Sequence, residues 1–293
     1  MKDFLRRIQS GDTLIFDGGM GSMLAAGGAG EGAGLANLSH PFLVKDIHIA
    51  YLAAGAECLI TNTLTLNAAY MKKIGLLHLL ESALYAGIEQ ALSAADGRAY
   101  VLGDMGPAGE LLAPYGSGDS DAFYDAFCRQ AAVFAEARLS GIIIETVFSW
   151  DEAKLMLAAC HDAAPSLPVI LSMTFANVKD GGRTIMGDKA ADIASSAGEL
   201  GACAVGTNCG DLAPKELVNT LLSMAPAGLP LIAQPNAGTP ILNGKHTVYD
   251  MPPEDFALGM LMLKRAGAQM LGGCCGTTPA HIAAIVKAIK KEH

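Results

Sequence analysis

The sequence predicts a (β/α)8 barrel, and three observations support this fold. Eight short apolar runs recur along the 293 residues, most of them are followed by a loop and a stretch with helical periodicity, and polar residues stand where the runs end. An open, doubly wound α/β sheet is the alternative fold. Because no linker-like segment interrupts the pattern, we expect residues 1–293 to form one domain.

The eight predicted strands are short and rich in branched apolar residues. They are Thr13–Phe16, Cys58–Thr61, Tyr100–Gly103, Ile142–Glu145, Val169–Met173, Cys203–Gly206, Leu231–Gln234 and Met270–Gly273. The predicted helices between them include Phe42–Ala56, Asp121–Ala137, Asp151–Ala164, Pro214–Met224, Pro253–Ala266 and Pro279–Lys290. Proline at the first helical position marks the start of the last three.

Composition narrows the class of partner. The chain is 51% hydrophobic and 17% charged, so it can bury a large core, and its formal net charge is −9 without any Lys/Arg run. This balance argues against binding of nucleic acid or an anionic membrane and favours a small molecule or another protein. The amino terminus has no signal-like apolar segment, and no run approaches the roughly 20 apolar residues that span a bilayer. We therefore expect a cytoplasmic protein.

Seven cysteines, an odd number, argue against a disulfide framework in a chain of this size. Cys58 and Cys203 lie in predicted strands, and Cys128 and Cys160 lie in predicted helices. These four are interpreted as structural thiols. The other three stand at strand ends.

The residues at the ends of the predicted strands are polar in seven cases of eight, and in a barrel this is where chemistry is placed. Asn62, Asp104 and Asn236 also have a structural interpretation, since Asp and Asn often begin turns or cap helices. The complete set is Asp17, Asn62, Asp104, Glu145, Cys209, Asn236 and the pair Cys274-Cys275.

Cys209, Cys274 and Cys275 together predict a soft-metal site. Neighbouring cysteines do not easily form a disulfide with each other, and glycines on both sides of the pair allow tight backbone turns. Three thiolates suit Zn²⁺, with a fourth position left for water or substrate. A redox pair or inert buried thiols are the alternatives. His281 falls inside a predicted helix and is interpreted as a surface residue rather than a ligand.

Ordered motifs then carry a family resemblance from end to end of the chain. They are DGGMGSML (Asp17–Leu24), ITNTL (Ile60–Leu64), GDMGPAGE (Gly103–Glu110), IIIETV (Ile142–Val147), SMTF (Ser172–Phe175), TNCG (Thr207–Gly210), PNAG (Pro235–Gly238) and GGCCGTTPAHI (Gly272–Ile282). With these motifs the chain resembles the homocysteine S-methyltransferase family, especially the homocysteine-binding module of cobalamin-dependent methionine synthase.

The resemblance implies a (β/α)8 barrel with a catalytic zinc on Cys209, Cys274 and Cys275 and homocysteine as methyl acceptor. It implies that Asp17 and Glu145 receive the amino group of homocysteine and that backbone amides of the loop Gly18–Ser22 hold its carboxylate. The implied substrate-binding residues are Asp17, Gly18, Gly19, Ser22, Asn62, Glu145 and Asn236. Either Asn236 or water is expected at the fourth zinc position.

The chemistry to be explained is the formation of a reactive thiolate, which zinc favours as a Lewis acid. One barrel uses nearly all the residues, so we expect the methyl donor to come from outside the chain, and the resemblance favours a methylated corrinoid protein carrying methylcobalamin. A small onium donor such as S-methylmethionine is the alternative within the enzyme class. A non-catalytic zinc- or thiol-binding barrel is the alternative outside it. Leu64, Ser149 and Met186 depart from the family pattern around the mouth of the site.

Overall fold

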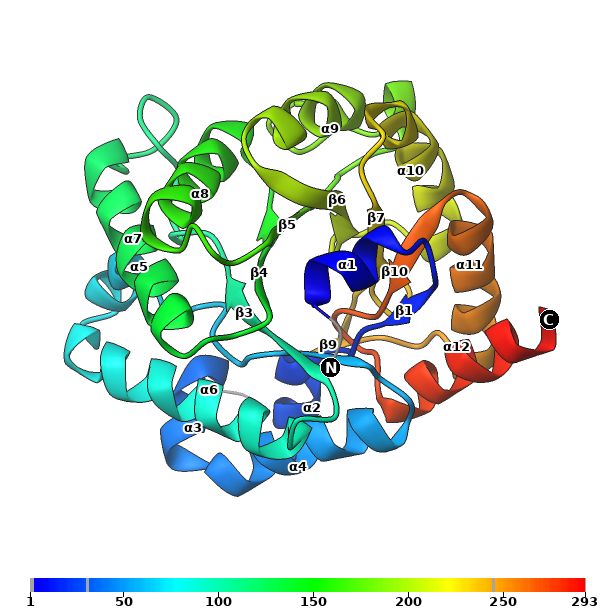
Figure 1. The fold of residues 1–293 in the computed structure, drawn as a ribbon, viewed down its shortest axis with the longest axis horizontal. Helices are drawn as coiled ribbons and strands as arrows, with labels where there is room; N and C mark the ends of the chain where they lie inside the picture. The colour runs from blue at the N-terminus through cyan, green and yellow to red at the C-terminus, as the bar shows by residue number, and fades with distance from the viewer. Residues whose placement is uncertain (1–2, 30–31, 244–245, 293) are drawn as a thin grey trace.

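Eight parallel strands form one sheet in a computed structural model that describes residues 3–29, 32–243 and 246–292 (Figure 1). Their order in the sheet is β1-β10-β7-β6-β5-β4-β3-β2. All eight predicted strands are confirmed, although several are longer or shorter than expected. They are β1 (Leu14–Ile15), β2 (Cys58–Ile60), β3 (Tyr100–Met105), β4 (Gly141–Val147), β5 (Val169–Met173), β6 (Ala202–Asn208), β7 (Leu231–Gln234) and β10 (Ala268–Leu271).

The two edges of this sheet meet and close the barrel. Phe16, directly after β1, forms a parallel bridge with Cys58 of β2. On either side of the bridge, the amide of Asp17 donates to the carbonyl of Cys58 at 3.1 Å, and the amide of Glu57 donates to the carbonyl of Ile15 at 2.7 Å. The structure therefore confirms the (β/α)8 barrel and contradicts the open-sheet alternative.

Helices surround the sheet in Figure 1, and the six predicted ones are present. The predicted helix over residues 214–224 is divided into a 3-10 turn, η4 (Pro214–Leu217), and α10 (Val218–Met224). The other helices are α1 (Phe4–Gln9), α2 (Met20–Ala26), α3 (Ala36–Ser39), α4 (Pro41–Ala53), α5 (Ala68–Lys73), α6 (Leu80–Ala95), α7 (Ser120–Glu136), α8 (Trp150–Ala163), α9 (Ala190–Glu199), α11 (Pro253–Arg265) and α12 (Pro279–Glu292), with short 3-10 turns η1 (Ala33–Leu35), η2 (Leu77–Leu79), η3 (Lys179–Gly181) and η5 (Ala225–Ala227).

A two-stranded antiparallel hairpin follows β7 and was not predicted. It consists of β8 (Ile241–Asn243) and β9 (His246–Val248), and residues 244–245 between them lie outside the described part of the chain. The Gly-rich segment Ala25–Gly34 is helical at its two ends, because α2 extends to Ala26 and η1 begins at Ala33; its residues 30–31 lie outside the described part.

The inside of the barrel is filled by one apolar cluster, which α1 closes at the amino-terminal end of the strands. Phe4 and Ile8 of α1 belong to this cluster, and the ring of Phe4 lies 5.0 Å from the ring of Tyr100, the first residue of β3. Figure 1 shows α1 lying across the barrel. The strands contribute Leu14, Phe16, Cys58, Tyr100, Leu102, Ile143, Ile170, Ala204, Ile232 and Met270.

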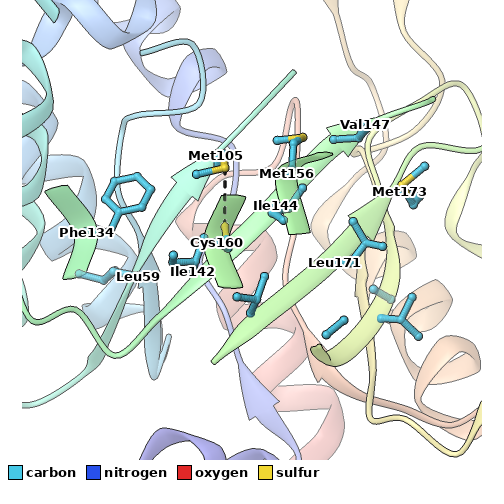
Figure 2. Close-up of a cluster of buried hydrophobic side chains, with 14 of the residues drawn as sticks. Leu59, Met105, Phe134, Ile142, Ile144, Val147, Met156, Cys160, Leu171 and Met173 are labelled. Carbon is cyan, nitrogen blue, oxygen red and sulfur yellow. Dashed lines mark hydrogen bonds between the residues drawn. The ribbon is translucent and has the colours of Figure 1, made fainter. Parts of the chain in front are cut away.

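A second, larger cluster fills the space between the sheet and the helices. Figure 2 shows part of it, with Ile142 and Ile144 of β4 near Met156 and Cys160 of α8. Cys160 donates a weak S–H hydrogen bond to the sulfur of Met105 at 3.9 Å. Cys58 and Cys160 are buried and Cys128 and Cys203 are half-buried, all of them as free thiols, in agreement with their predicted structural role.

In the described part of the chain, none of the helices combines the length and apolar character needed to cross a bilayer. The cytoplasmic location and the single-domain organisation stay predictions.

Truncation of a buried ring in the outer cluster tests this packing. Phe134 of α7 is fully buried and lies against Gly103, where an added Cβ would come within 2.5 Å of the ring. We expect Phe134→Ala to lower the free energy of unfolding by about 3–5 kcal/mol, because it leaves a cavity between helix and sheet. Phe42→Ala, at an 82% exposed position of α4, is the control and should change it by less than about 0.5 kcal/mol in urea titrations. Equal losses in the two variants would contradict the packing.

Candidate active site

A cavity of about 150 Å³ lies at the carboxyl end of the strands. Of the ten residues predicted for the site, eight line it. These are Asp17, Gly18, Gly19, Ser22, Asn62, Glu145, Cys274 and Cys275. Asp104 lines it as well, and so does Leu64, one of the departures from the family pattern.

The three cysteines predicted as metal ligands come together beside this cavity. The sulfur atoms of Cys209, Cys274 and Cys275 all lie within 4.8 Å of one another, and in the described part of the chain they are the one group of three or more His, Cys, Asp or Glu side chains placed to hold an ion. Sulfurs bonded to one tetrahedral zinc at about 2.3 Å lie about 3.8 Å apart. The arrangement therefore fits a zinc thiolate site with small adjustments of the side chains.

Backbone geometry directs Cys209 toward the other two thiols. Its φ is 56°, in the left-handed region that residues other than glycine rarely adopt, at a cost of roughly 1–3 kcal/mol. The surrounding structure maintains this conformation, because the amide of Cys209 donates to the carbonyl of Gln234 at 3.2 Å. The Asn236 side chain also donates to the carbonyl of Gly210 at 2.6 Å.

The cysteine pair is anchored by backbone hydrogen bonds to the loop after β7. The amide of Cys274 donates to the carbonyl of Pro235 at 2.9 Å, and the amide of Ala237 donates to the carbonyl of Cys275 at 3.0 Å. The three thiols are thus held by the ends of adjacent strands, β6, β7 and β10.

The thiols affect one another strongly. Hydrogen bonds from Cys209 and Cys274 lower the pKa of Cys275 and favour the thiolate form of its sulfur. The matching contacts with Cys209 and Cys275, followed by burial, raise the pKa of Cys274. Three buried sulfurs this close cannot all ionise without a neighbouring cation, and a divalent metal ion supplies that charge.

Three carboxyl groups line the same cavity. Burial raises the pKa values of Asp17 and Asp104 and raises that of Glu145 to about 7. The sulfur of Cys275 is the second cause for Glu145. The described lining contains no Lys or Arg, so a bound cation is the group that would stabilise these carboxylates in their charged form.

Asp17 is fixed by the closure of the barrel. Its carboxylate accepts a hydrogen bond from the amide of Ile60 at 2.9 Å, and the amide of Gly273 donates to its carbonyl at 3.0 Å. His48 lies 4.0 Å away, but burial lowers the pKa of this imidazole to about 4. His48 is therefore neutral at pH 7 and does not compensate the charge of Asp17.

The glycine loop after β1 lies directly against the cysteine pair. A Cβ at Gly19 would lie 2.5 Å from the carbonyl oxygen of Cys274, so only glycine fits there. The amide of Gly19 donates to the hydroxyl of Thr277 at 2.9 Å. The hydroxyl of Ser22 accepts from the amide of Gly276 at 3.1 Å and donates to the carbonyl of Gly19 at 3.2 Å. The Ser22 side chain thus connects the two loops.

The two predicted asparagines occupy different places. Asn62 lines the cavity, and its side-chain amide donates to the side chain of Asn37 at 2.8 Å. Asn236 lies outside the cavity lining, and its buried Oδ1 has no hydrogen-bond partner in the described structure. Asn236 lies between Pro235 and Ala237, whose backbone groups bond to the cysteine pair, and an unpaired buried oxygen in this loop is a feature that a metal ion could satisfy.

Other residues of the site were not predicted. Tyr249 follows the β8–β9 hairpin, and its ring lies against Gly276, while burial, followed by the nearby Cys275, raises the pKa of its hydroxyl. Tyr51 of α4 donates to the carbonyl of Thr277 at 3.0 Å. Neither tyrosine follows a predicted strand, so the strand-end rule could not find them.

The prediction that His281 lies on the helix surface is wrong. This side chain is only 7% exposed, its Nε2 contacts the carbonyl of Met251 at 3.0 Å, and the amide of Thr278 donates to its Nδ1 at 3.2 Å. The His281 ring, which α12 carries, is covered by α11, where the ring of Phe256 lies 5.4 Å away. His281 is also outside the cysteine group, as expected.

The pH dependence of folding tests the environment of Glu145. Its pKa is raised to about 7 from 4.5, so the stability associated with its protonated form is complete below pH 4.5 and is lost as the pH rises to 7. Glu145→Gln removes this loss, so the variant should gain roughly 3 kcal/mol relative to the native chain between pH 4.5 and pH 8. Urea titrations across this range measure it, with the exposed Glu89→Gln as control. A constant difference for Glu145→Gln would contradict the buried carboxyl.

Comparison with known proteins agrees with this geometry. Methionine synthase from Mycobacterium tuberculosis is 28% identical over 299 residues, which cover 94% of this chain and 24% of that protein. The Mycobacterium leprae methionine synthase is 27% identical over a match that covers 87% of this chain and 22% of that protein. The chain thus spans about a quarter of the length of these relatives.

Solved structures match the fold. The metallated form of the homocysteine methyltransferase MmuM from Escherichia coli superposes with a TM-score of 0.79 at 24% identity, covering 99% of this chain and 100% of that one. The carboxyl transferase domain of Rhizobium etli pyruvate carboxylase has a TM-score of 0.53 at 14% identity, covering 98% and 48%. The homocysteine S-methyltransferase family model matches residues 14–289, and the chain belongs to this family.

Proposed function

We propose that this protein transfers a methyl group to the thiol of homocysteine, giving methionine, in a zinc-dependent reaction. The observation that carries the proposal is the group of three sulfurs within 4.8 Å at the edge of a cavity that Asp17 and Glu145 also line. The cavity thus offers a soft-metal site for a thiol and an anionic site for an ammonium group. Homocysteine contains both.

Zinc is the metal that this donor set favours. Three thiolates with a fourth position open to water or substrate are typical of catalytic zinc sites. Oδ1 of Asn236, buried and without a partner in the described structure, is the proposed alternative to water at the fourth position. The metallated form of the MmuM structure supports a metal in a barrel of this fold.

Asp17 and Glu145 would bind the amino group of homocysteine. An ammonium group between two buried carboxylates stabilises their charged forms, which burial alone disfavours. The amide of Gly19 is already engaged by Thr277. We therefore assign the substrate carboxylate to the other amides of the loop Gly18–Ser22. Asn62, joined to Asn37, would line the side of the pocket.

With both ends of the amino acid held, the substrate sulfur faces the methyl donor. Bound zinc would supply Lewis-acid stabilisation of the thiolate form. A new bond forms between this sulfur and the methyl carbon, while the bond from the methyl carbon to the donor breaks and its electron pair leaves with the donor. The carboxylates contribute by orienting the nucleophile rather than by taking part in bond making.

A methylated corrinoid protein is the proposed donor. Large apolar side chains are exposed on the loops at the carboxyl end of the barrel, where a protein donor would have to dock. Tyr115, Ile185 and Leu242 are 72%, 72% and 77% exposed. The methionine synthase relatives are about four times longer than this chain, which agrees with a donor module outside the barrel.

A small onium donor such as S-methylmethionine is the second candidate. The observation that favours it is the match to MmuM, because the alignment covers 100% of that homocysteine methyltransferase. A single barrel of this kind thus forms the whole of a chain whose structure is solved.

Metal analysis tests the cysteine group. We expect about one zinc per chain in the purified protein and a loss of most of it in Cys209→Ser, because a serine hydroxyl is a much weaker ligand for zinc than a thiolate. Cys203→Ser is the matched control and should keep the zinc, since Cys203 lies on β6, the strand directly before Cys209, and is outside the cysteine group. Full zinc in Cys209→Ser would reject the ligand set. Zinc without a change in its X-ray absorption spectrum on addition of homocysteine would favour a non-catalytic barrel.

A donor-exchange assay tests the source of the methyl group. We expect methionine to form from homocysteine with a methylcobalamin-loaded corrinoid protein and not with S-methylmethionine. In the same assay, Asp17→Asn should raise the KM for homocysteine at least tenfold, because it removes one contact with the ammonium group. Mass spectrometry of methionine formation measures both. Turnover with S-methylmethionine alone would reject the corrinoid donor and leave methyl transfer to homocysteine in place.

A further inference from the structure

Asn208 is a fully buried side chain at the end of β6, directly before Cys209. Its Oδ1 accepts hydrogen bonds from the amide of Thr146 at 3.0 Å and from the hydroxyl of Ser172 at 2.9 Å. Its Nδ2 donates to the hydroxyl of Thr146 at 2.8 Å and to the sulfur of Cys274 at 3.9 Å. Because a backbone amide only donates, the contact with Thr146 determines which side of the Asn208 side chain carries the oxygen.

The contacts with Thr146 act on the position of Glu145. Thr146 has a φ of 61°, which is rare for a β-branched residue. Between Ile144 and Val147 the pairing of β4 with β5 shifts by one residue, so Glu145 and Thr146 form a bulge. Bulges turn side chains toward active sites, and this one directs Glu145 into the cavity. Asn208 binds both the amide and the hydroxyl of Thr146 and so holds the bulge.

The contact with Cys274 acts on the sulfur site. An amide N–H that points at a cysteine sulfur stabilises its thiolate and limits the rotation of the side chain. Asn208 is also the chain neighbour of Cys209, so it is connected to two of the three sulfurs. One amide group thus joins the bulge behind a carboxylate to the group of thiols.

We infer that Asn208 is a positioning residue that fixes the separation between the Glu145 carboxylate and the Cys209–Cys274–Cys275 sulfurs, and thereby the length of amino thiol that the site accepts. The inference rests on the proposed function, in which the ammonium group and the thiol of one substrate bind at these two places. In the proposed function homocysteine would span these two places, and cysteine is shorter by one methylene. Hydrophobic contacts discriminate between two substrates that differ by one methylene by only about 10–200-fold. A fixed separation between the two binding places would therefore add to the selectivity for homocysteine over cysteine.

The test uses the full chain loaded with Co²⁺, whose thiolate charge-transfer band reports on the sulfurs without any turnover. Asn208→Asp keeps the oxygen that accepts from the Thr146 amide and the Ser172 hydroxyl. It loses the hydrogen bonds that Nδ2 donates to the Thr146 hydroxyl and the Cys274 sulfur. We expect a shifted band, a 10–100-fold weaker affinity for Co²⁺, and a smaller ratio of kcat/KM for homocysteine over cysteine. Asn67→Asp is the matched control, because Asn67 is also fully buried, accepts from Tyr70 and donates to Pro107, outside the cavity lining.

A second variant tests the contact of Asn208 with Thr146 separately from its contact with Cys274, and it is available if Asn208→Asp does not fold. Thr146→Val keeps the shape of the side chain and removes its hydroxyl. It should raise the Kd and the KM for homocysteine several-fold while the cobalt band stays unchanged. An unchanged band and affinity in Asn208→Asp, or an unchanged Kd in Thr146→Val, would overturn the role of Asn208. Cobalt binding without homocysteine binding in the native chain would instead reject the proposed function.

Discussion

Closure of the sheet between β1 and β2 is the constraint on which the site depends. The bridge between Phe16 and Cys58 places Asp17 beside Ile60, and the carboxylate of Asp17 accepts a hydrogen bond from the amide of Ile60. On its other side β1 pairs with β10, and the glycine loop after β1 therefore lies against Cys274, which follows β10. Asp17 and the pair Cys274-Cys275, from opposite ends of the chain, therefore line one cavity.

Charge determines what this cavity can accept. Carboxyl groups and thiols line it, and the described lining provides no cationic side chain. Burial makes each of these groups costly to ionise alone, so the site is prepared for ligands that bring positive charge. In the proposed function, an ammonium group and a divalent metal ion would both meet this requirement.

The strand-end rule predicted most of the site because it depends only on the period of a strand and on the polarity of a barrel. Asp17, Glu145 and the three cysteines are found in this way, and the structure brings them together. Asn208 was overlooked because β6 is longer than its apolar run, which placed the residue in a loop.

Contacts that depend on the pairing of strands could not be predicted. The bulge at Thr146 arises from the register between β4 and β5, and no local sequence signal gives that register. The burial of His281 likewise depends on the packing of α11 against α12, whereas its helix was predicted from its proline start. Helix α6 begins at Leu80, and its N-cap residue Leu79 has no side chain that could cap it, so the helix carried no start signal.

The short helix α1 has a consequence for the order of events. Phe4 and Ile8 cover the amino-terminal end of the barrel and belong to the buried apolar cluster that fills its inside. Under the proposed function, amino acid, donor and product would then all enter and leave at the opposite end of the barrel. In the proposed methyl transfer, the ligand that binds deeper in the cavity would then enter first and leave last, so two side chains of α1 would influence the kinetic order of a reaction at the other end of the barrel.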